Sequence, residues 1–512
     1  MKHPTRSILL GLAILASACS SAEEDVTPAT DEGPNIVVFL TDDQTVEQVR
    51  VMTQVDALMR AEGVTFANSF VNYALCCPAR ATLLTGQHAS NHGVLWNGGP
   101  TGGYDNFADQ ESALPVALSE AGYLTVHVGK YLNGFGLPPF LGGATSIEEL
   151  EPPPGWDEFR GLISPTEVYY TEPTFLDRGD VVTYDEDDYV TDVVTDLVVD
   201  SITRAASLDR PFFLQVGYSA PHAQGGLPLN EVEAGTFFDR IAERYPDLPF
   251  VEAVPAPRHA GTLAGEPLLT SPAIGEDDIS DKPQAVRYPE LTDAQLERLG
   301  DIYRSELESL LAVDESVAAI IEELDRLGEL EETYLVFTSD NGYLHGEHRI
   351  WPAKYFPYEE ALRVPLLIVG PGLQPGRTVD SVVSNVDLAP TILELAGAAP
   401  LRQPDGRSLV GLLRDTEQEW TRAILVEGHA PEGQLLTFGG RQAPAFSGVH
   451  TGEAVYVEYA DGSRELYDLT VDPFQLENIA AREGAAELER QMAAWLKELE
   501  SCRGESCRTV GS

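Results

Sequence analysis

The chain is poor in cysteine, in basic residues and in long apolar runs. Five of its 512 residues are cysteine, and 33 Lys or Arg face 82 Asp or Glu, a formal net charge of −49. Because attraction to phosphates needs a basic face, this balance excludes nucleic acid as a partner. After the N-terminal segment, no apolar run is long enough to span a membrane. The hydrophobic share of 43% still permits a large core, which favours a main domain and a smaller second one.

The N-terminus predicts an export signal. Two basic residues precede an apolar run at 8–16, which is too short to cross a bilayer. Small residues and then Cys19 end this run, and the arrangement resembles a bacterial lipoprotein cleavage site. We therefore expect residues 1–19 to form a lipoprotein signal ending at a lipidated Cys19, followed by an acidic tether at 20–33. An ordinary secretory signal that contains a cysteine is the alternative.

A lipidated Cys19 predicts a location in the bacterial cell envelope. Ser20 follows it in place of the aspartate linked to inner-membrane retention, which favours the outer membrane, on its periplasmic or surface side. The membrane would then be a partner only through the lipid, and without the lipid the protein would be secreted. Export also permits disulfides, and Cys502 and Cys507 could close a small loop within the polar tail at 501–512.

Apolar runs of strand length alternate with helical segments along most of the chain. The segment at 291–327 opens with a capping-box spacing and ends at Gly328, so it predicts a long helix, and 115–121 predicts a short one. Buried strands are predicted at 35–41, 125–129, 211–217, 334–339 and 365–369. This alternation is typical of an α/β fold with a doubly wound, mostly parallel sheet flanked by helices.

The pattern changes beyond residue 413. Residues 453–468 alternate apolar and polar side chains around a turn signal, and 485–500 predict an amphipathic helix. We therefore predict a main domain at 34–413 and a smaller antiparallel α+β subdomain at 414–500.

Polar side chains follow the predicted strands where each strand ends. In open α/β sheets, ligands bind at the carboxyl edge, so these residues predict a site there. The segment at 223–289 lacks clear periodicity, and we expect it to pass over that face. The polar residues are Asp42, Asp43, Lys130, His222, Asp340 and Asn341.

The segment Cys76-Cys77-Pro78-Ala79-Arg80 carries the most specific pattern. Pro78 suits a first helical turn and the residues through Leu84 favour a helix, so we expect Cys76 just before a helix N-terminus. A buried thiol before a helix is the alternative, but it leaves the Cys-x-Pro-x-Arg spacing unexplained.

This spacing, followed by Leu84-Thr85-Gly86, resembles the signature of the type I sulfatase family, whose fold is alkaline-phosphatase-like. Ala79 stands where the family often has serine. The resemblance runs from residue 35 to about 480 and includes the motifs around Lys130, His222, 339–342 and 466–469. The segment at 129–133, the Pro-Gly-Trp at 154–156 and the doubled cysteine resemble the N-acetylglucosamine-6-sulfatase or heparan-type subgroup. That likeness implies a sulfated carbohydrate substrate.

The resemblance implies a role for each residue of the nucleophile's surroundings. A formylglycine-generating enzyme oxidises Cys76 to formylglycine during export, and Arg80 orients and helps activate that group. One hydroxyl of the hydrated formylglycine attacks sulfur and the second expels sulfate, which a plain serine or cysteine cannot do. Lys130 and Lys354 bind the sulfate, and His222 lies near the leaving group as its proton donor.

The same edge predicts a metal site. Three carboxylates and an amide suit Ca²⁺ better than Zn²⁺, and the resemblance adds an oxygen of the modified Cys76 as a further ligand. Alone, Asp42 and Asp43 would be a solvated loop pair, but Asp340 and Asn341 at an equivalent edge favour the metal.

One position departs from the family. Many arylsulfatases carry histidine two residues after the first lysine, where this chain has Leu132, so the base for sulfate elimination is unassigned. His127 and His345 are candidates, and each is equally typical of a structural histidine. We expect Tyr358 and Glu360, which also resemble family motifs, to be structural.

These patterns predict a sulfuric ester hydrolase acting on a sulfated carbohydrate, such as a glycosaminoglycan. One alternative is a phosphonate or phosphate monoester hydrolase on the same fold, against which Lys130, His222 and Lys354 argue. The other is a lipoprotein that binds sulfated glycans without cleaving them, against which the intact Cys76 motif and the metal set argue.

Overall fold

A computed structural model describes residues 33–137, 147–164, 166–208, 210–224, 252–415, 420–430, 437–438, 441–442 and 444–511. The predicted signal with Cys19, most of the predicted tether and residues 225–251 lie outside the described residues. Within the described part of the chain, no helix has both the length and the apolar composition needed to cross a bilayer.

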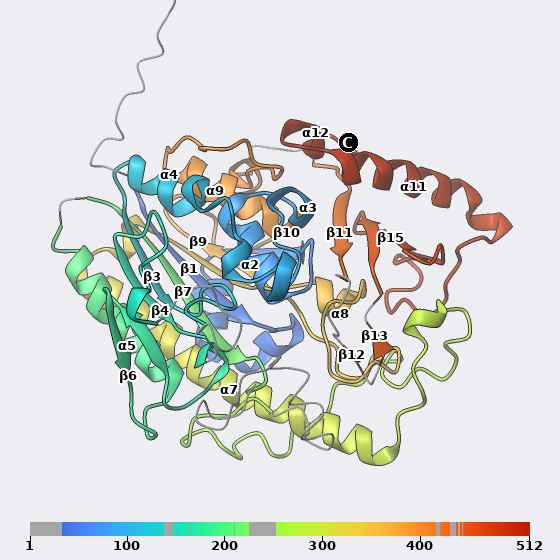
Figure 1. The fold of residues 1–512 in the computed structure, drawn as a ribbon, viewed down its shortest axis with the longest axis horizontal. Helices are drawn as coiled ribbons and strands as arrows, with labels where there is room; N and C mark the ends of the chain where they lie inside the picture. Colours follow the sequence, from blue (N-terminus) through green and yellow to red (C-terminus); the bar gives the residue numbers. More distant parts are fainter. Residues whose placement is uncertain are drawn as a thin grey trace, which may run out of the picture.

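A ten-stranded sheet forms the centre of the molecule (Figure 1). Its strand order is β10-β2-β9-β8-β1-β7-β3-β4-β5-β6. The strands are β1 (Asn35–Asp42), β2 (Val64–Phe70), β3 (Leu124–Gly129), β4 (Glu158–Leu162), β5 (Thr174–Asp177), β6 (Asp180–Thr183), β7 (Phe212–Pro221), β8 (Thr333–Ser339), β9 (Leu366–Val369) and β10 (Arg377–Ser384).

The central pairs of this sheet are parallel. β1 pairs in parallel with β7 and β8, and β3 pairs in parallel with β7 and β4. β9 is antiparallel to both of its neighbours, and β5 and β6 add an antiparallel edge. The predicted mostly parallel sheet is confirmed.

Helices cover both faces of the sheet, as the near-continuous apolar strands require. α5 (Val190–Ala205) and α7 (Asp293–Leu327) pack into one core with Val37 and Phe39 of β1. The opposite core holds Ile36 and Val38 with α2 (Cys76–Thr85), α4 (Leu114–Glu120) and α9 (Leu388–Leu395). The predicted capping box of α7 forms between Thr292 and Gln295, and Gly328 ends the helix with φ +80°.

A second, smaller sheet is antiparallel and has the order β11-β14-β15-β16. Its strands are β11 (Ile424–Gly428), β14 (Phe446–His450), β15 (Ala454–Tyr459) and β16 (Arg464–Asp468). The predicted helix is α11 (Ala486–Ser501), which packs on this sheet through Met492, Leu496 and Leu499. The shorter elements are α1 (Thr53–Val55), α3 (Ala89–His92), α8 (Glu359–Leu362), α10 (Val410–Leu413), α12 (Glu505–Arg508), β12 (Thr437–Phe438) and β13 (Arg441–Gln442).

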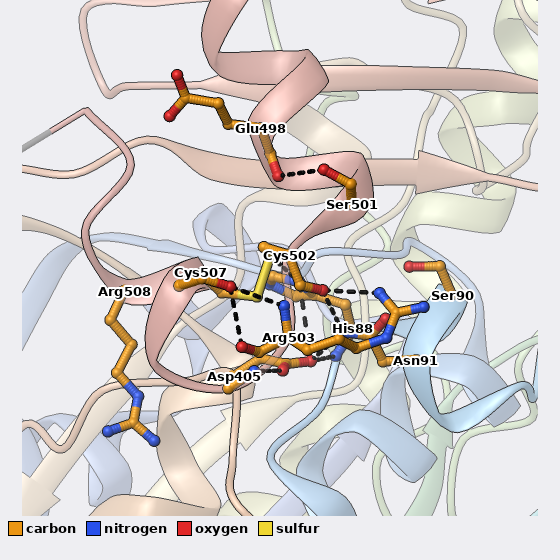
Figure 2. Close-up of a disulfide and its surroundings, with 12 residues drawn as sticks. His88, Ser90, Asn91, Asp405, Glu498, Ser501, Cys502, Arg503, Cys507 and Arg508 are labelled. Carbon is orange, nitrogen blue, oxygen red and sulfur yellow. Dashed lines mark hydrogen bonds and ion pairs between the residues drawn. A yellow bond between two sulfur atoms is a disulfide. The ribbon is translucent and has the colours of Figure 1, made fainter.

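A disulfide joins Cys502 and Cys507 at the C-terminal end, as the spacing allowed (Figure 2). The loop that it closes docks onto Asp405, whose carboxylate accepts hydrogen bonds from the backbone N–H of Gly504 at 2.6 Å and of His88 at 2.9 Å. Because His88 directly precedes α3, this contact ties the C-terminus to the region that follows α2.

Residues 252–289 are irregular, as their sequence predicted. Gly275 donates a hydrogen bond to the carbonyl of Gly346, so part of the segment lies beside the loop that follows β8. Ala253 and Ala256, in contrast, pack into the core beside α5 and α7, a position that the sequence did not indicate.

Candidate active site

The polar residues predicted at the strand ends meet at one edge of the sheet. β1 ends at Asp42, which is in register with Pro221 at the end of β7, and Thr41 is in register with Ser339 at the end of β8. Gly129, at the end of β3, is in register with Gly217 of β7. The residues that follow these ends are therefore neighbours: Asp43, Lys130, His222, Asp340 and Asn341.

Cys76 is the first residue of α2, and Leu75 is the N-cap, with an extended backbone at φ −151°. The helix thus begins one residue earlier than predicted, because Leu75 rather than Cys76 takes the extended conformation. The Cys76 Sγ is 3.3 Å from Asp42 Oδ1 and 2.7 Å from Lys354 Nζ. The predicted nucleophile therefore lies between a predicted metal ligand and a predicted sulfate-binding lysine.

Three buried carboxylates form the cluster expected of a cation site. Oxygen atoms of Asp42, Asp43 and Asp340 lie within 4.8 Å of one another. Asn341 Nδ2 donates to Asp43 Oδ1 at 2.6 Å, and its Oδ1 has no hydrogen-bond partner in the described part of the chain. A buried, unpartnered oxygen next to three carboxylates fits a hard divalent cation such as Ca²⁺.

Each cation of the site pairs with one of these carboxylates. Lys130 Nζ contacts Asp42 Oδ2, and Lys354 Nζ lies 2.5 Å from Asp43 Oδ1. Arg80 Nε donates to Asp340 Oδ2 at 2.7 Å and its Nη1 donates to the carbonyl of Lys130 at 2.9 Å.

Arg80 also has one donor group, Nη2, without a hydrogen-bond acceptor among the described residues. Its Nη2 lies 3.7 Å from Asp42 Oδ2 and makes no hydrogen bond within the described ranges. The guanidinium is 1% exposed, so this free N–H group is available only to something bound inside the site. An anion such as sulfate offers the oxygen acceptors that it lacks.

Burial and charge shift the pKa values of the acidic groups in opposite directions. Burial would raise the pKa of Asp42, but Lys130, His222 and Lys354 hold it below its usual range. Burial and the Asp42 charge raise the pKa of Asp340 to about 6. Burial and Asp42 also raise the pKa of the Cys76 thiol far above its ordinary value, although the lysines oppose this. An unmodified Cys76 is therefore a protonated, poor nucleophile.

His222 has a more exposed side chain, at 21%, than Asp42, Asp43, Lys130 or Lys354. Its Nδ1 lies 2.6 Å from the carbonyl of Ala223, which identifies Nδ1 as the protonated donor. Nε2 is then the nitrogen that faces the site, 3.8 Å from Asp43 Oδ2. Tyr170 donates to the His222 carbonyl at 2.8 Å and holds this backbone in place.

The residues considered for the base of sulfate elimination make no hydrogen bond to Cys76 in the described part of the chain. Leu132 is buried in the core beside α2 and α4. His127 stacks on Phe159 among aromatic rings, and burial lowers its pKa to about 3. His345 Nε2 lies 2.7 Å from Glu306. Among the residues that the structure describes, neither histidine hydrogen-bonds to Cys76, and both have the surroundings of structural histidines.

The residues that hold α2 were not identified from the sequence. Glu427, in β11, accepts hydrogen bonds from Asn72 Nδ2 at 3.1 Å and from the N–H of Ser90 at 3.2 Å. Asn72 Oδ1 in turn accepts from Thr82 of α2 at 3.2 Å. The smaller sheet therefore supports the helix that begins with Cys76. No local pattern marks these residues, because they meet only through the tertiary fold.

Known proteins are similar to this chain in sequence and in architecture. The sulfatase family model matches residues 34–398, and the model for the C-terminal part of N-sulphoglucosamine sulphohydrolase matches 346–502. An arylsulfatase of Volvox carteri is 32% identical over 535 residues, covering 98% of this chain and 78% of its own. N-acetylglucosamine-6-sulfatase of Homo sapiens is 31% identical over 518 residues, covering 93% and 86%.

One solved structure shows the same fold at lower identity. A protein in complex with its substrate D-glucosamine-2-N,6-O-disulfate superposes with a TM-score of 0.72 at 23% identity, over 91% of this chain and 97% of that one. Because the family model matches most of the chain, the chain belongs to the sulfatase family and is a sulfuric ester hydrolase. The predicted likeness to N-acetylglucosamine-6-sulfatases is confirmed. Sulfatases in general use a formylglycine and a divalent metal.

Proposed function

We propose that this sulfatase removes sulfate from a sulfated carbohydrate and that Cys76 is the precursor of its formylglycine. The position of the Cys76 Sγ supports this, 3.3 Å from Asp42 and 2.7 Å from Lys354 at the start of a buried helix. A hydrated formylglycine at residue 76 would supply two hydroxyls, one for attack on sulfur and one for release of sulfate.

The surrounding side chains bind the sulfate, orient residue 76 and protonate the leaving group. Lys130 and Lys354 bind sulfate oxygens with Arg80, whose free Nη2 needs an acceptor. The bonds of Arg80 to Asp340 and to the Lys130 carbonyl fix its direction, so that it orients the group at residue 76. His222 presents Nε2 to the leaving oxygen and, as an imidazolium whose Nδ1 proton stays bonded to the Ala223 carbonyl, donates its Nε2 proton to the departing alcohol.

Ca²⁺ is the proposed metal, held by Asp42, Asp43, Asp340 and Asn341 with an oxygen of the modified Cys76. Bound there, it would supply positive charge that acidifies a hydroxyl at residue 76. Calorimetric titration of chelator-treated protein tests the site without an activity assay. We expect one Ca²⁺ per chain in the wild type and none in Asp340→Asn, and equal binding by both proteins would contradict the assignment.

The proposed substrate is a glycosaminoglycan containing 6-O-sulfated glucosamine. The similarity to N-acetylglucosamine-6-sulfatase and to the fold solved with a glucosamine disulfate supports this choice. Sulfate release from glucosamine 6-sulfate, compared with 2-O- and 4-O-sulfated sugars, tests it, and a preference for either of the latter would refute it. Turnover of aryl sulfate over aryl phosphate would separate the sulfatase from a phosphonate or phosphate monoester hydrolase.

We also propose that Cys19 carries the lipid that anchors the mature chain to the bacterial envelope. The sequence pattern at the end of the apolar run supports this. Labelling with a fatty acid should mark the wild type and leave Cys19→Ala unmarked and released from membranes. An unlabelled wild type would favour the secreted form.

The decisive experiment is the mass of the peptide containing Cys76 after export through the native route with a formylglycine-generating enzyme present. Conversion of the thiol to the aldehyde lowers the mass by about 18 Da. An unmodified peptide in an active enzyme would overturn the proposed nucleophile. An unmodified, inactive protein that still binds sulfated glycans would support the non-catalytic alternative.

A further inference from the structure

The helix that starts with Cys76 cannot cap its own N-terminus. Its N-cap is Leu75, whose side chain has no polar atom, and α2 has no side-chain cap from that residue. Ala79 N–H already donates to the Leu75 carbonyl at 3.0 Å, and Pro78 has no N–H. The N–H of Cys77, directly after the proposed nucleophile, is thus a donor of the first turn that has no acceptor within the helix.

Asn97 provides the missing acceptor from another part of the chain. Its Oδ1 accepts the hydrogen bond of Cys77 N–H at 2.9 Å. This is the contact that an asparagine N-cap makes within its own helix. Here it comes from a residue 20 positions away in the sequence, so the position of the helix start depends on a tertiary contact.

The loop that carries Asn97 is tightly closed. Leu95 N–H donates to the Thr101 carbonyl at 2.7 Å and Gly103 N–H to the Trp96 carbonyl at 3.0 Å. Asn106 Nδ2 bridges the carbonyls of two glycines of the loop, 99 and 102, at 2.8 and 2.6 Å. The loop therefore presents the Asn97 amide from a rigid frame.

We infer that Asn97 is a positioning residue for the sulfatase reaction and that it acts through the Cys77 N–H on residue 76. The inference rests on the proposed function, in which Cys76 becomes the nucleophile. Misplacing a reacting group by about 1 Å can lower the reaction rate by about 100-fold. A cap that fixes the first turn of α2 therefore affects turnover more than substrate binding.

Three variants test this role. Asn97→Ala removes the cap, and we expect kcat for an aryl sulfate to fall at least tenfold with KM within threefold of the wild type. Asn97→Asp keeps the acceptor oxygen, so kcat should stay within threefold, while the added charge raises KM for an anionic substrate. Asn106→Ala removes two hydrogen bonds from the same loop and leaves the contact of Asn97 with Cys77 in place, so kcat should fall much less than in Asn97→Ala. The mass of the residue 76 peptide in each variant must show the same conversion as the wild type.

The outcomes separate this inference from the proposed function. Cys76→Ala that retains activity would refute the nucleophile itself. An inactive Cys76→Ala together with a kcat for Asn97→Ala within threefold of the wild type would overturn only the role of Asn97. An equal loss of kcat in Asn97→Ala and Asn106→Ala would also overturn it, because the loop as a whole would then be responsible. A loss of kcat in Asn97→Asp as large as in Asn97→Ala would likewise overturn the role of Asn97, because the aspartate keeps the acceptor oxygen.

Discussion

Replacing Arg80 with lysine keeps a positive charge in the site and removes the fork of the guanidinium. The arginine holds Asp340 Oδ2 at 2.7 Å and the Lys130 carbonyl at 2.9 Å, and one ammonium on an unbranched stem cannot keep both directions. A charge-assisted hydrogen bond contributes about 1.5–3 kcal/mol. If one such bond is lost in the transition state, kcat/KM falls by roughly 10- to 150-fold, since about 1.4 kcal/mol corresponds to a factor of ten.

Arg160→Lys is the matched control. Arg160 is also buried and holds Asp177 at 2.8 Å and the Leu197 carbonyl at 2.9 Å, and it has no hydrogen bond to the residues around Cys76 in the described chain. Initial rates on an aryl sulfate, corrected for formylglycine content, give kcat/KM, and urea unfolding gives stability. We expect Arg160→Lys to lose stability and to keep kcat/KM. A kcat/KM for Arg80→Lys within threefold of the wild type, or an equal loss in the control, would refute the reasoning.

Three further perturbations have expected outcomes. Glu427→Gln places an amide nitrogen where the carboxylate accepts several hydrogen bonds, so urea unfolding should show a loss of about 1–3 kcal/mol, and kcat should fall because α2 loses support. A Cys502→Ser, Cys507→Ser double variant opens a loop with a sequence separation of 5, which should cost about 2 kcal/mol of unfolding free energy without changing KM. Glu306 outweighs burial and raises the pKa of His345, so this pair stabilises the fold fully below about pH 6.5 and less as the pH rises through the higher folded-state pKa. The difference in melting temperature between the wild type and His345→Gln should accordingly shrink at alkaline pH, and a constant difference would contradict the pairing.

The sequence predicted the elements whose patterns are strong and local. β1 is buried on both faces and reads as a continuous apolar run, and α7 carries its own start and stop signals at Thr292 and Gly328. β5 and β6 were not predicted, because each has only four residues. The antiparallel direction of β9 was also not predictable, since direction depends on the connection and not on the run itself.

In the candidate site, too, the residues with a local sequence pattern were predictable and the others were not. The carboxylates and lysines follow strand ends or lie in a recognisable motif, so their convergence could be expected from the parallel sheet. Asn97 and Glu427 could not be found in this way. Asn97 contacts α2 through one hydrogen bond, and Glu427 acts on α2 through Asn72, which accepts a hydrogen bond from Thr82. These contacts exist only after distant segments of the chain have packed together.

The acidic net charge of the chain and an anionic substrate are compatible because the charge near residue 76 is set locally. Three carboxylates there are matched by three cations, Arg80, Lys130 and Lys354, so the site is close to neutral despite a net charge of −49 for the chain. At physiological salt, exposed charges are screened beyond about 8 Å, whereas buried pairs are screened much less. A divalent cation held by the carboxylates would then leave the site with a positive excess. The carboxylates would thus hold the metal, and the lysines and Arg80 that pair with them would face the sulfate.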